Sequence, residues 1–437
     1  MTRKLIPLLI AGLFASASAH ADEAELRARI EKLTSELEAL KAEMKRLSTQ
    51  TEAIASQQES AAKTAPTPAV GAASGVSGYV ASPGGTVGQT SVFGYGEINY
   101  NRPRSDTSET QADLRRAVIG LGHRFNDRTR FVSEFEFEHA VTSADDRGET
   151  EVEQFWIDHQ VSDFVNLKAG LFLIPSGLLN ETHEPTRYYG VERNFVETAI
   201  IPSTWREGGV GLYGTSSFGL AWDVGVTTGF DLAKWDASST EGRESPLGSI
   251  HQELQLAKAK DLATYAALNY RGLAGLTLGG SIFTGRAGQG QPDFAAQNAR
   301  VTLWDAHARW QAGNLDLSAL YAKGTISDTE ALNLTFAGQP TPVPKEFFGW
   351  YTQAAYRAWQ SGDYALTPFV RYERFNTAAK YAPTPEGLGV NPAETERVLT
   401  YGLSFNLHPD VVLNTDYQKF KVDDSRDRLN VGLGLMF

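Results

Sequence analysis

From Ser91 to the C-terminal Phe437, hydrophobic and polar residues alternate along the chain with a period of two. In the last segment, positions 429, 431, 433, 435 and 437 are Leu, Val, Leu, Leu and Phe, and the positions between them are Asn, Gly, Gly and Met. The same alternation recurs in segments such as 128–139 and 164–173. It is typical of amphipathic β-strands, and about ten residues is the length of a strand that crosses a membrane at a tilt.

The breaks between these segments alternate strictly between short and long. Short breaks lie near residues 127, 163, 217, 274, 313, 362 and 409; longer ones lie near 103–111, 140–149, 174–205, 231–261, 286–300, 325–345, 377–394 and 421–427. This parity places every tight turn at one end of the sheet, which a sandwich with crossover connections would not do. We therefore predict an all-β transmembrane barrel of about 16 antiparallel up-and-down strands over residues 91–437, wide enough to hold water.

The first ninety residues follow other patterns. Arg3 and Lys4, an apolar run and the small-residue site Ala19-His20-Ala21 predict a secretory signal peptide over residues 1–21. Apolar residues then recur at spacings of four and three, which predicts an α-helical coiled coil over residues 22–60 and hence self-association. Its heptads are compatible with a coiled coil of two helices or of three. Residues 61–90 are rich in Ala, Pro, Gly and Ser, which predicts a flexible linker. The predicted coiled-coil core is Leu26, Ile30, Leu33, Leu37, Leu40, Met44 and Leu47.

Composition excludes several classes of protein. The 437 residues include no cysteine, so disulfides, cysteine-ligated metals and thiol nucleophiles are excluded. A net charge of -12 argues against a nucleic-acid partner. The mean hydropathy of -0.29 is that of a soluble protein, but alternation explains it, because half of each strand faces water. No cofactor motif is found, and none of the histidines has a metal-binding or catalytic spacing, so we expect no metal, no cofactor and no enzyme.

The connection 174–205 is long and rich in apolar residues, unlike a solvated outer loop. We expect it to fold into the barrel and narrow it. Rings of Arg and Lys favour anions, and rings of Asp and Glu favour cations. The alternative is a mixed, solvated wall without strong selectivity. Charged candidates in or next to this loop are Arg187, Glu192, Arg193, Arg206 and Glu207, and candidates on the lumen face of the strands are Arg116, Arg130, Lys168, Arg309 and Arg371.

Four stretches of the chain resemble the phosphate-selective porin O and P family. They are Asp113–Gly122 with its arginine pair, Ala169–Leu178, Val191–Phe195 and Ile201–Gly214. The resemblance implies a homotrimeric 16-stranded outer-membrane channel with an inward third loop, and anion uptake through an eyelet lined by arginine and lysine.

By position, the resemblance also makes Arg115 or Arg116, Arg193 and Arg206 the basic residues of this eyelet. The coiled coil resembles that of relatives that take up small carboxylates, which places it in the periplasm. We therefore expect passive diffusion of small anions, phosphate or carboxylates, with further copies of the chain, outer-membrane lipid and the solute as partners.

Two alternatives stay open. The predicted signal peptide and coiled-coil region nearly cancel in charge, so the barrel holds the whole acidic excess. That favours a non-selective or cation-preferring general porin. The coiled coil, in contrast, is compatible with an envelope-organising protein for which the barrel is only an anchor.

Overall fold

The computed structural model describes residues 87–437. The predicted signal peptide, the predicted coiled coil and most of the predicted linker lie outside these residues. Within the described part of the chain, no helix combines the length and apolar content needed to cross a membrane.

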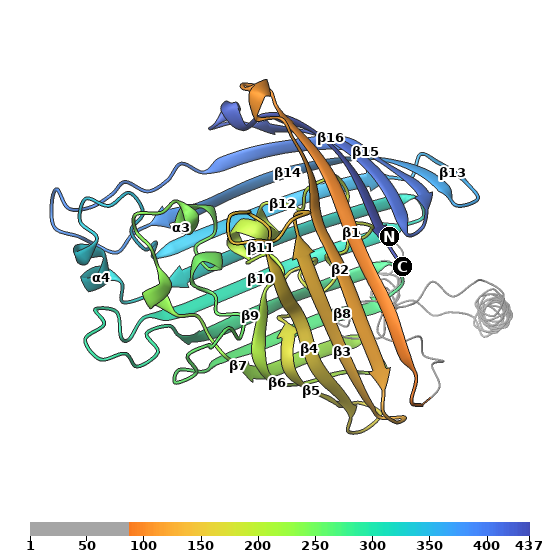
Figure 1. Ribbon diagram of the computed structural model, residues 1–437, viewed down its shortest axis with the longest axis horizontal. Coiled ribbons are helices and arrows are strands. Elements are labelled where there is room, and N and C mark those ends of the chain that lie inside the picture. Colours follow the sequence, from red (N-terminus) through yellow and green to blue (C-terminus); the bar gives the residue numbers. More distant parts are fainter. Residues whose placement is uncertain (1–86) are drawn as a thin grey trace, which may run out of the picture. The chain divides into compact units, whose positions relative to one another are not determined.

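The described residues are mainly strands joined by turns and loops (Figure 1). The strands are β1 (Thr90–Pro103), β2 (Gln111–Arg124), β3 (Thr129–Glu138), β4 (Thr150–Gln160), β5 (Asn166–Leu173), β6 (Arg206–Thr215), β7 (Leu220–Thr227), β8 (Ala263–Leu273), β9 (Leu276–Arg286), β10 (Arg300–Ala312), β11 (Leu315–Ile326), β12 (Glu346–Tyr356), β13 (Trp359–Ser361), β14 (Tyr364–Lys380), β15 (Glu396–His408), β16 (Val411–Phe420) and β17 (Arg428–Met436). Short helical turns lie in the long connections: η1 (Thr107–Glu109), η2 (Val196–Ile200), η3 (Leu232–Lys234), α3 (Glu241–Glu244), η4 (Gly248–Ile250), α4 (Glu330–Thr335) and η5 (Asp424–Arg426).

The strands close into one antiparallel barrel. Apart from β12 and β13, each strand pairs with its neighbours in the chain, and β1 pairs with both β2 and β17, which leaves no free edge. The three-residue β13 continues β12 after a break at 357–358, and both pair with β14. The wall therefore has 16 strands, as the alternation predicts, with tight turns and long connections in the predicted order.

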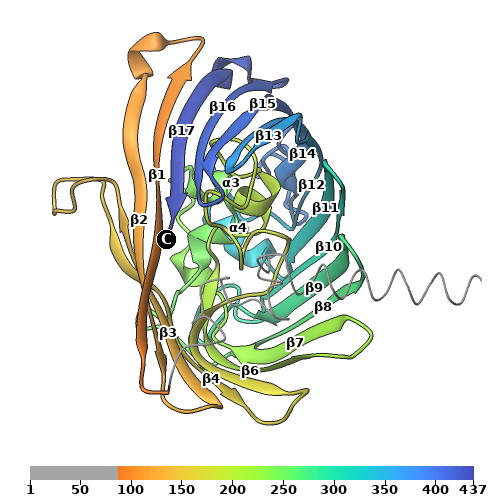
Figure 2. The same ribbon diagram turned by 90° about the vertical axis from the view of Figure 1, so that its right-hand side faces the viewer.

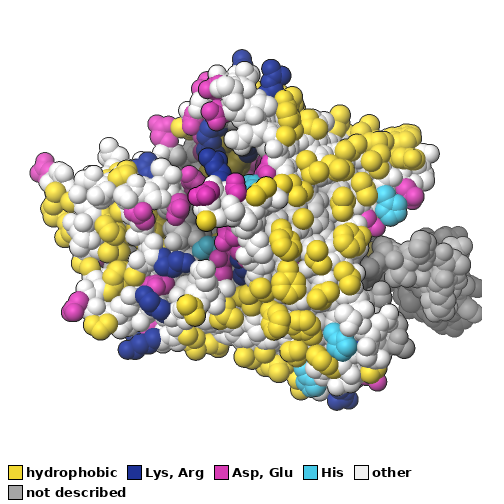
Figure 3. All heavy atoms as spheres, in the orientation of Figure 1, with side chains coloured by type: hydrophobic (Ala, Val, Ile, Leu, Met, Phe, Trp, Pro, Cys, Tyr) yellow, Lys and Arg dark blue, Asp and Glu magenta, His cyan; other side chains and the backbone are white. Residues whose placement is uncertain are grey.

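The alternation separates an outer from an inner face of the wall. In β17, Leu429, Val431 and Leu435 are exposed on the outside, and Asn430 and Gly434 are buried inside. Exposed apolar side chains cover much of the wall, whereas charged ones gather in the hollow and on the loops (Figure 3). This is the arrangement that lipid outside and polar groups inside require.

Connections from the long-loop end fill part of the barrel. Residues 174–205 lie inside the ring of strands (Figure 2). An aromatic cluster joins Trp205 at the end of this connection to Phe230 and to Phe283 of β9, with ring centroids 4.6–5.5 Å apart. The interior therefore contains a true hydrophobic core, which anchors the loops to the wall.

Candidate pore constriction

The two ends of the loop 174–205 are joined by one amide side chain. Nδ2 of Asn180 donates to the carbonyl oxygens of Ile174 and Trp205, both at 2.8 Å, and its Oδ1 accepts from the Trp205 N–H at 2.7 Å. Asn180 is buried. Since a buried polar group is costly unless it is bonded, this closed set fixes the point where the chain leaves β5 and re-enters β6.

The second half of the loop, residues 195–201, is its apolar part. It contains the single π-helical turn η2, which packs against β11, β12 and β14. Val196, Ile200 and Ile201 are each 0% exposed and belong to the interior core. Phe195 stacks on Phe375 of β14 with centroids 5.2 Å apart. Burial of these side chains explains why an apolar sequence lies in a long connection.

One buried carboxylate organises the apolar part. Oε1 of Glu197 accepts from the N–H groups of Leu178 and Leu179 at 2.5 and 2.7 Å. Its Oε2 accepts from Asn194 at 2.7 Å and from the Tyr351 hydroxyl of β12 at 3.0 Å. Three of these bonds lie within the loop, and two of the three join its start to its apolar part. The fourth ties the loop to the wall through Tyr351, and together they offset the desolvation of the charge.

A glycine makes room for this carboxylate. Gly177 has a φ of +72°, and a Cβ there would lie 2.4 Å from Oε1 of Glu197. Any side chain would be strained and would collide with the buried carboxylate.

The first half of the loop, residues 183–193, is its charged part, and acids of the wall hold it. Asp416 of β16 accepts from the Val191 N–H at 2.7 Å, and Glu97 of β1 accepts from the Tyr188 hydroxyl at 2.7 Å. Two further acids bind neighbouring loop residues: Glu373 accepts from the Phe195 N–H at 2.6 Å, Asp305 from the Gly177 N–H at 3.1 Å. Part of the barrel's acidic excess therefore holds the loop.

Two predicted selectivity residues also anchor the loop. Arg116 is 2% exposed, donates from Nε to Glu97 at 2.7 Å and from Nη2 to the His183 carbonyl at 2.7 Å. Arg371, equally buried, pairs with Glu373 at 3.0 Å and donates to the carbonyl oxygens of Tyr189 and Glu192, both at 3.2 Å. Each guanidinium is thus neutralised by a carboxylate and held by loop backbone.

Other predicted candidates are paired elsewhere on the wall. Lys168 is buried, lies 2.6 Å from Asp223 and sits 4.5 Å from the Phe172 ring centroid. Arg130 pairs with Asp158 at 2.5 Å. Arg309 pairs with Asp316 at 2.7 Å. Arg206 pairs with Glu151, and also with Glu253, which lies 2.9 Å away. Glu207 accepts from the Trp205 indole N–H at 3.3 Å and from the Thr228 hydroxyl at 2.5 Å.

Arg115 and Arg116 are separated by an irregularity in the wall. The register between β1 and β2 shifts next to Arg116, so that Arg115 has no partner on β1 in the ladder and is exposed. Of the arginine pair, only Arg116 contacts the loop. Glu192, a further candidate, accepts from Asn101 at 3.2 Å.

Two loop arginines differ from the rest, because neither forms an ion pair within residues 87–437. Arg193 is partly buried and donates to Thr204 at 3.3 Å. Burial and the nearby Arg116 lower the pKa of its guanidinium. Arg187 is exposed. Neither guanidinium has a carboxylate partner at ion-pair distance among the described residues.

A small pocket brings three predicted arginines together. Arg187 from the loop, Arg309 from β10 and Arg371 from β14 line it. None of the described residues that line it is Asp or Glu. We call it the arginine pocket; its other lining residues are Leu178, Leu179, Tyr188, Tyr189, Asn194, Ser318, Tyr351 and Gln353.

Sequence reasoning missed the residues that position the loop. Asn180, Glu197 and His183 make its central contacts, yet they carry no spacing signal, because their partners lie anywhere from 3 to 154 residues away with no regular period. Glu373 and Asp416 are buried wall residues, and their role as acceptors for loop N–H groups depends on where the loop lies.

Comparison with known proteins agrees with this architecture. The sequence profile of the family described as phosphate-selective porin O and P matches residues 89–433. An uncharacterized protein of Aquifex aeolicus (strain VF5) is 30% identical over 347 residues, which is 77% of each chain.

Two solved barrels share the fold at low sequence identity. OmpF of Salmonella typhi, in complex with daunomycin, is 14% identical with a TM-score of 0.56 over 80% of this chain and 98% of that one. A loop-deletion mutant of OmpT, an outer membrane protein of Vibrio cholerae, is 10% identical with a TM-score of 0.51 over 80% of this chain and all of that one. The profile match, the extent of the Aquifex relative and the closed barrel together show that this chain belongs to the phosphate-selective porin O and P family and is an outer-membrane porin.

Proposed function

We propose that the protein lets small hydrophilic anions, phosphate or small carboxylates, diffuse passively across the outer membrane past the loop 174–205. The observation that carries this proposal is the arginine pocket, which is lined by three guanidinium groups and by no carboxylate. Arginine forks match the oxygens of phosphate and carboxylate groups.

The local charge differs from the charge of the whole chain. Acids of the wall are engaged by loop N–H groups and by Arg116, Arg309 and Arg371. Arg187 and Arg193 lack such partners among the described residues. A pore selects by the charges that the ion meets at its narrowest part, so an acidic barrel is compatible with anion preference.

The test is the reversal potential of purified protein in planar bilayers under a potassium chloride gradient. We expect wild type to prefer chloride, and Arg187→Gln to lower the anion-to-cation permeability ratio at least about twofold. Arg128→Gln removes the same charge from a tight turn far from the loop and serves as the matched control. Cation preference in wild type, or equal effects of the two variants, would contradict the proposal.

A specific observation favours the alternative of a cation-preferring general porin. Glu134 and Glu136 lie buried on the inner face of β3, and Glu192 of the loop has no cation partner within residues 87–437. Block of chloride current by phosphate or by a dicarboxylate would distinguish an anion-specific pore from this alternative, which predicts no block.

For assembly, we propose a homotrimer with a periplasmic coiled coil. The predicted heptads and the family support it. Measuring the molecular mass of the assembled full chain and of a variant lacking residues 22–63 tests this proposal. If the coiled coil holds the three chains together, its deletion weakens the trimer. An envelope-organising role predicts instead that this deletion leaves conductance intact and disturbs the cell envelope.

A further inference from the structure

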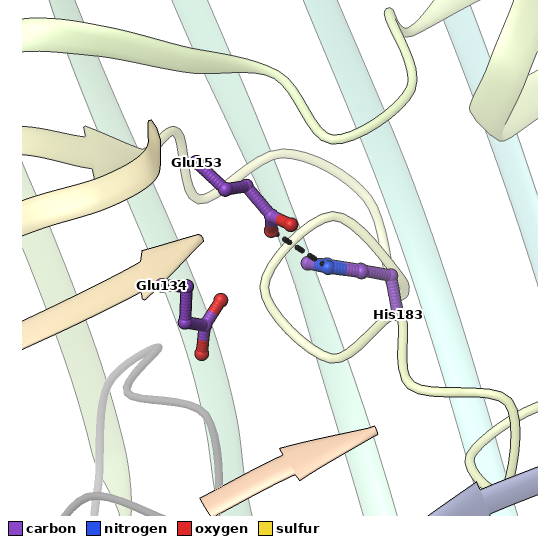
Figure 4. Close-up of side chains that lie close together, drawn as sticks. All are labelled: Glu134, Glu153 and His183. Atoms are coloured by element: carbon purple, nitrogen blue, oxygen red, sulfur yellow. Dashed lines mark ion pairs between the residues drawn. The ribbon is translucent and has the colours of Figure 1, made fainter. Parts of the chain in front are cut away.

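A separate cluster of buried side chains lies where the charged part of the loop meets β3 and β4. Glu134 of β3, Glu153 of β4 and His183 of the loop each direct a possible ligand atom toward the same point (Figure 4). These three atoms lie within 4.8 Å of one another. The side chains are 1%, 0% and 3% exposed, so bulk water does not hydrate their polar atoms.

The histidine is oriented as a ligand would be. Its Nδ1 lies 3.0 Å from the carbonyl oxygen of Asn180, which only accepts, so Nδ1 carries the hydrogen. The other nitrogen, Nε2, faces Oε1 of Glu153 at 2.9 Å. At this distance a hydrogen must lie between Nε2 and Oε1, and a cation bound at Nε2 would take the place of that hydrogen. Metal-bound histidines commonly donate their second ring N–H to a backbone carbonyl in this way.

The carboxylate of Glu134 is only half satisfied. Its Oε2 accepts from Gln154 at 2.7 Å, which fixes the group in place. Its Oε1 is buried and has no hydrogen-bond partner. A buried carboxylate oxygen without a partner is unfavourable, and a cation near Glu153 and His183 would satisfy it.

We propose that Glu134, Glu153 and His183 bind a divalent transition-metal ion, best represented by Zn²⁺, which ties the loop to the barrel wall. One imidazole and two carboxylates suit such an ion, whereas Ca²⁺ and Mg²⁺ prefer oxygen ligands alone. The Tyr95 hydroxyl borders the site, 2.7 Å from Nε2 of His183 and 3.1 Å from Oε2 of Glu153. A water molecule would complete the four-coordinate shell that Zn²⁺ prefers.

Binding requires a small rearrangement. Ligand atoms about 2.1 Å from a tetrahedral ion lie about 3.4 Å from each other. Nε2 of His183 and Oε1 of Glu153, now 2.9 Å apart, must therefore separate slightly, while Glu134 draws in from within 4.8 Å. His183 belongs to the loop and the two glutamates to adjacent strands, so the bound ion would link the loop to β3 and β4. The ion would act beside Arg116, which already binds the His183 carbonyl.

The test measures Zn²⁺ binding to metal-free, full-length protein in detergent by calorimetry and by metal analysis. We expect one site per chain, a higher unfolding temperature with Zn²⁺, and reversal by a chelator. His183→Gln and Glu134→Gln should each weaken binding at least about tenfold. His408→Gln, at an exposed histidine of a tight turn, should bind as wild type does.

The outcome does not depend on ion selectivity, because no gradient or current is involved. Absence of Zn²⁺ binding by wild type, or unchanged binding by both variants, overturns the proposal. Should either variant fail to form a barrel, X-ray absorption of Zn²⁺-loaded wild type decides: a shell with one imidazole and carboxylate oxygens supports the site. A shell without imidazole overturns it.

Discussion

The two parts of the constriction loop are held to the same wall by different forces. The apolar part, 195–201, buries Val196, Ile200 and Ile201 against β11, β12 and β14. The charged part, 183–193, is held by directed bonds to Glu97, Asp416 and other wall residues. Hydrophobic burial is non-directional and tolerates small shifts, whereas hydrogen bonds fix position. The difference indicates that one part secures the loop and the other sets its geometry.

The largest effect is expected for Glu197→Gln, which breaks the link between the loop and β12. Either orientation of the amide turns its NH₂ toward N–H groups that now donate to Glu197: those of Leu178 and Leu179 in one, that of the Asn194 side chain in the other. We expect a loss of about 4 kcal/mol in stability and a severalfold higher single-channel conductance as the loop leaves the lumen. Thermal unfolding and bilayer recordings measure both, with Glu386→Gln in an exposed loop as control. Unchanged conductance would show that other contacts secure the loop.

Ile200→Ala tests the apolar part directly. The side chain is 0% exposed, and its truncation leaves a cavity against the wall, which we expect to cost about 3 kcal/mol. Unfolding temperature measures this loss. Leu256→Ala, at a fully exposed leucine, should change nothing. Equal effects of the two substitutions would contradict hydrophobic anchoring.

Asp416→Asn tests the charged part more gently. The new Asn side chain keeps an oxygen that accepts from the Val191 N–H, but it loses the charge. Its NH₂ group faces the donor Nδ2 of Asn430, unless the Asn430 amide group flips. We expect a loss of about 1 kcal/mol and a clear change in conductance. A change in stability without a change in conductance would show that this part does not set the pore geometry.

The smallest effect concerns pH. The pKa of Glu181 is raised to about 7, chiefly by burial; Lys168 opposes this rise and Asp223 adds to it. The folded state therefore favours the protonated carboxyl, and the associated stability is lost as pH rises from about 4.5 through 7. Ionisation also adds negative charge to the loop, so anion preference should fall between pH 6 and 8. In the Glu181→Gln variant, position 181 has no titrating group, so the reversal potential should not change with pH across this range.

The fold was largely predictable from local patterns. Alternation with a period of two marks every strand, because each strand has one side toward lipid and one toward the lumen. The parity of short and long breaks determined the up-and-down order, and the apolar content of 174–205 indicated that it folds inward. Such signals are local, so one sequence is sufficient to read them.

The site was predictable only as a set of candidate charges. The pattern placed Arg116, Arg309 and Arg371 on the inner face, but each is paired with a carboxylate there. Their carboxylate partners lie only 19, 7 and 2 residues away along the chain, but the loop carbonyls that Arg371 also binds are 182 and 179 residues away. The sequence alone does not show which of these contacts form.

The sequence by itself determined the barrel, its strand number and order, and the inward loop, because these follow from solvent on one face of each strand and lipid on the other. Only the tertiary structure decided which acids hold the loop, which arginines meet in one pocket, and that Glu134, Glu153 and His183 converge. The physical reason is that burial and pairing of charge are long-range properties. A residue's neighbours through space, and not along the chain, set the energy of its charge.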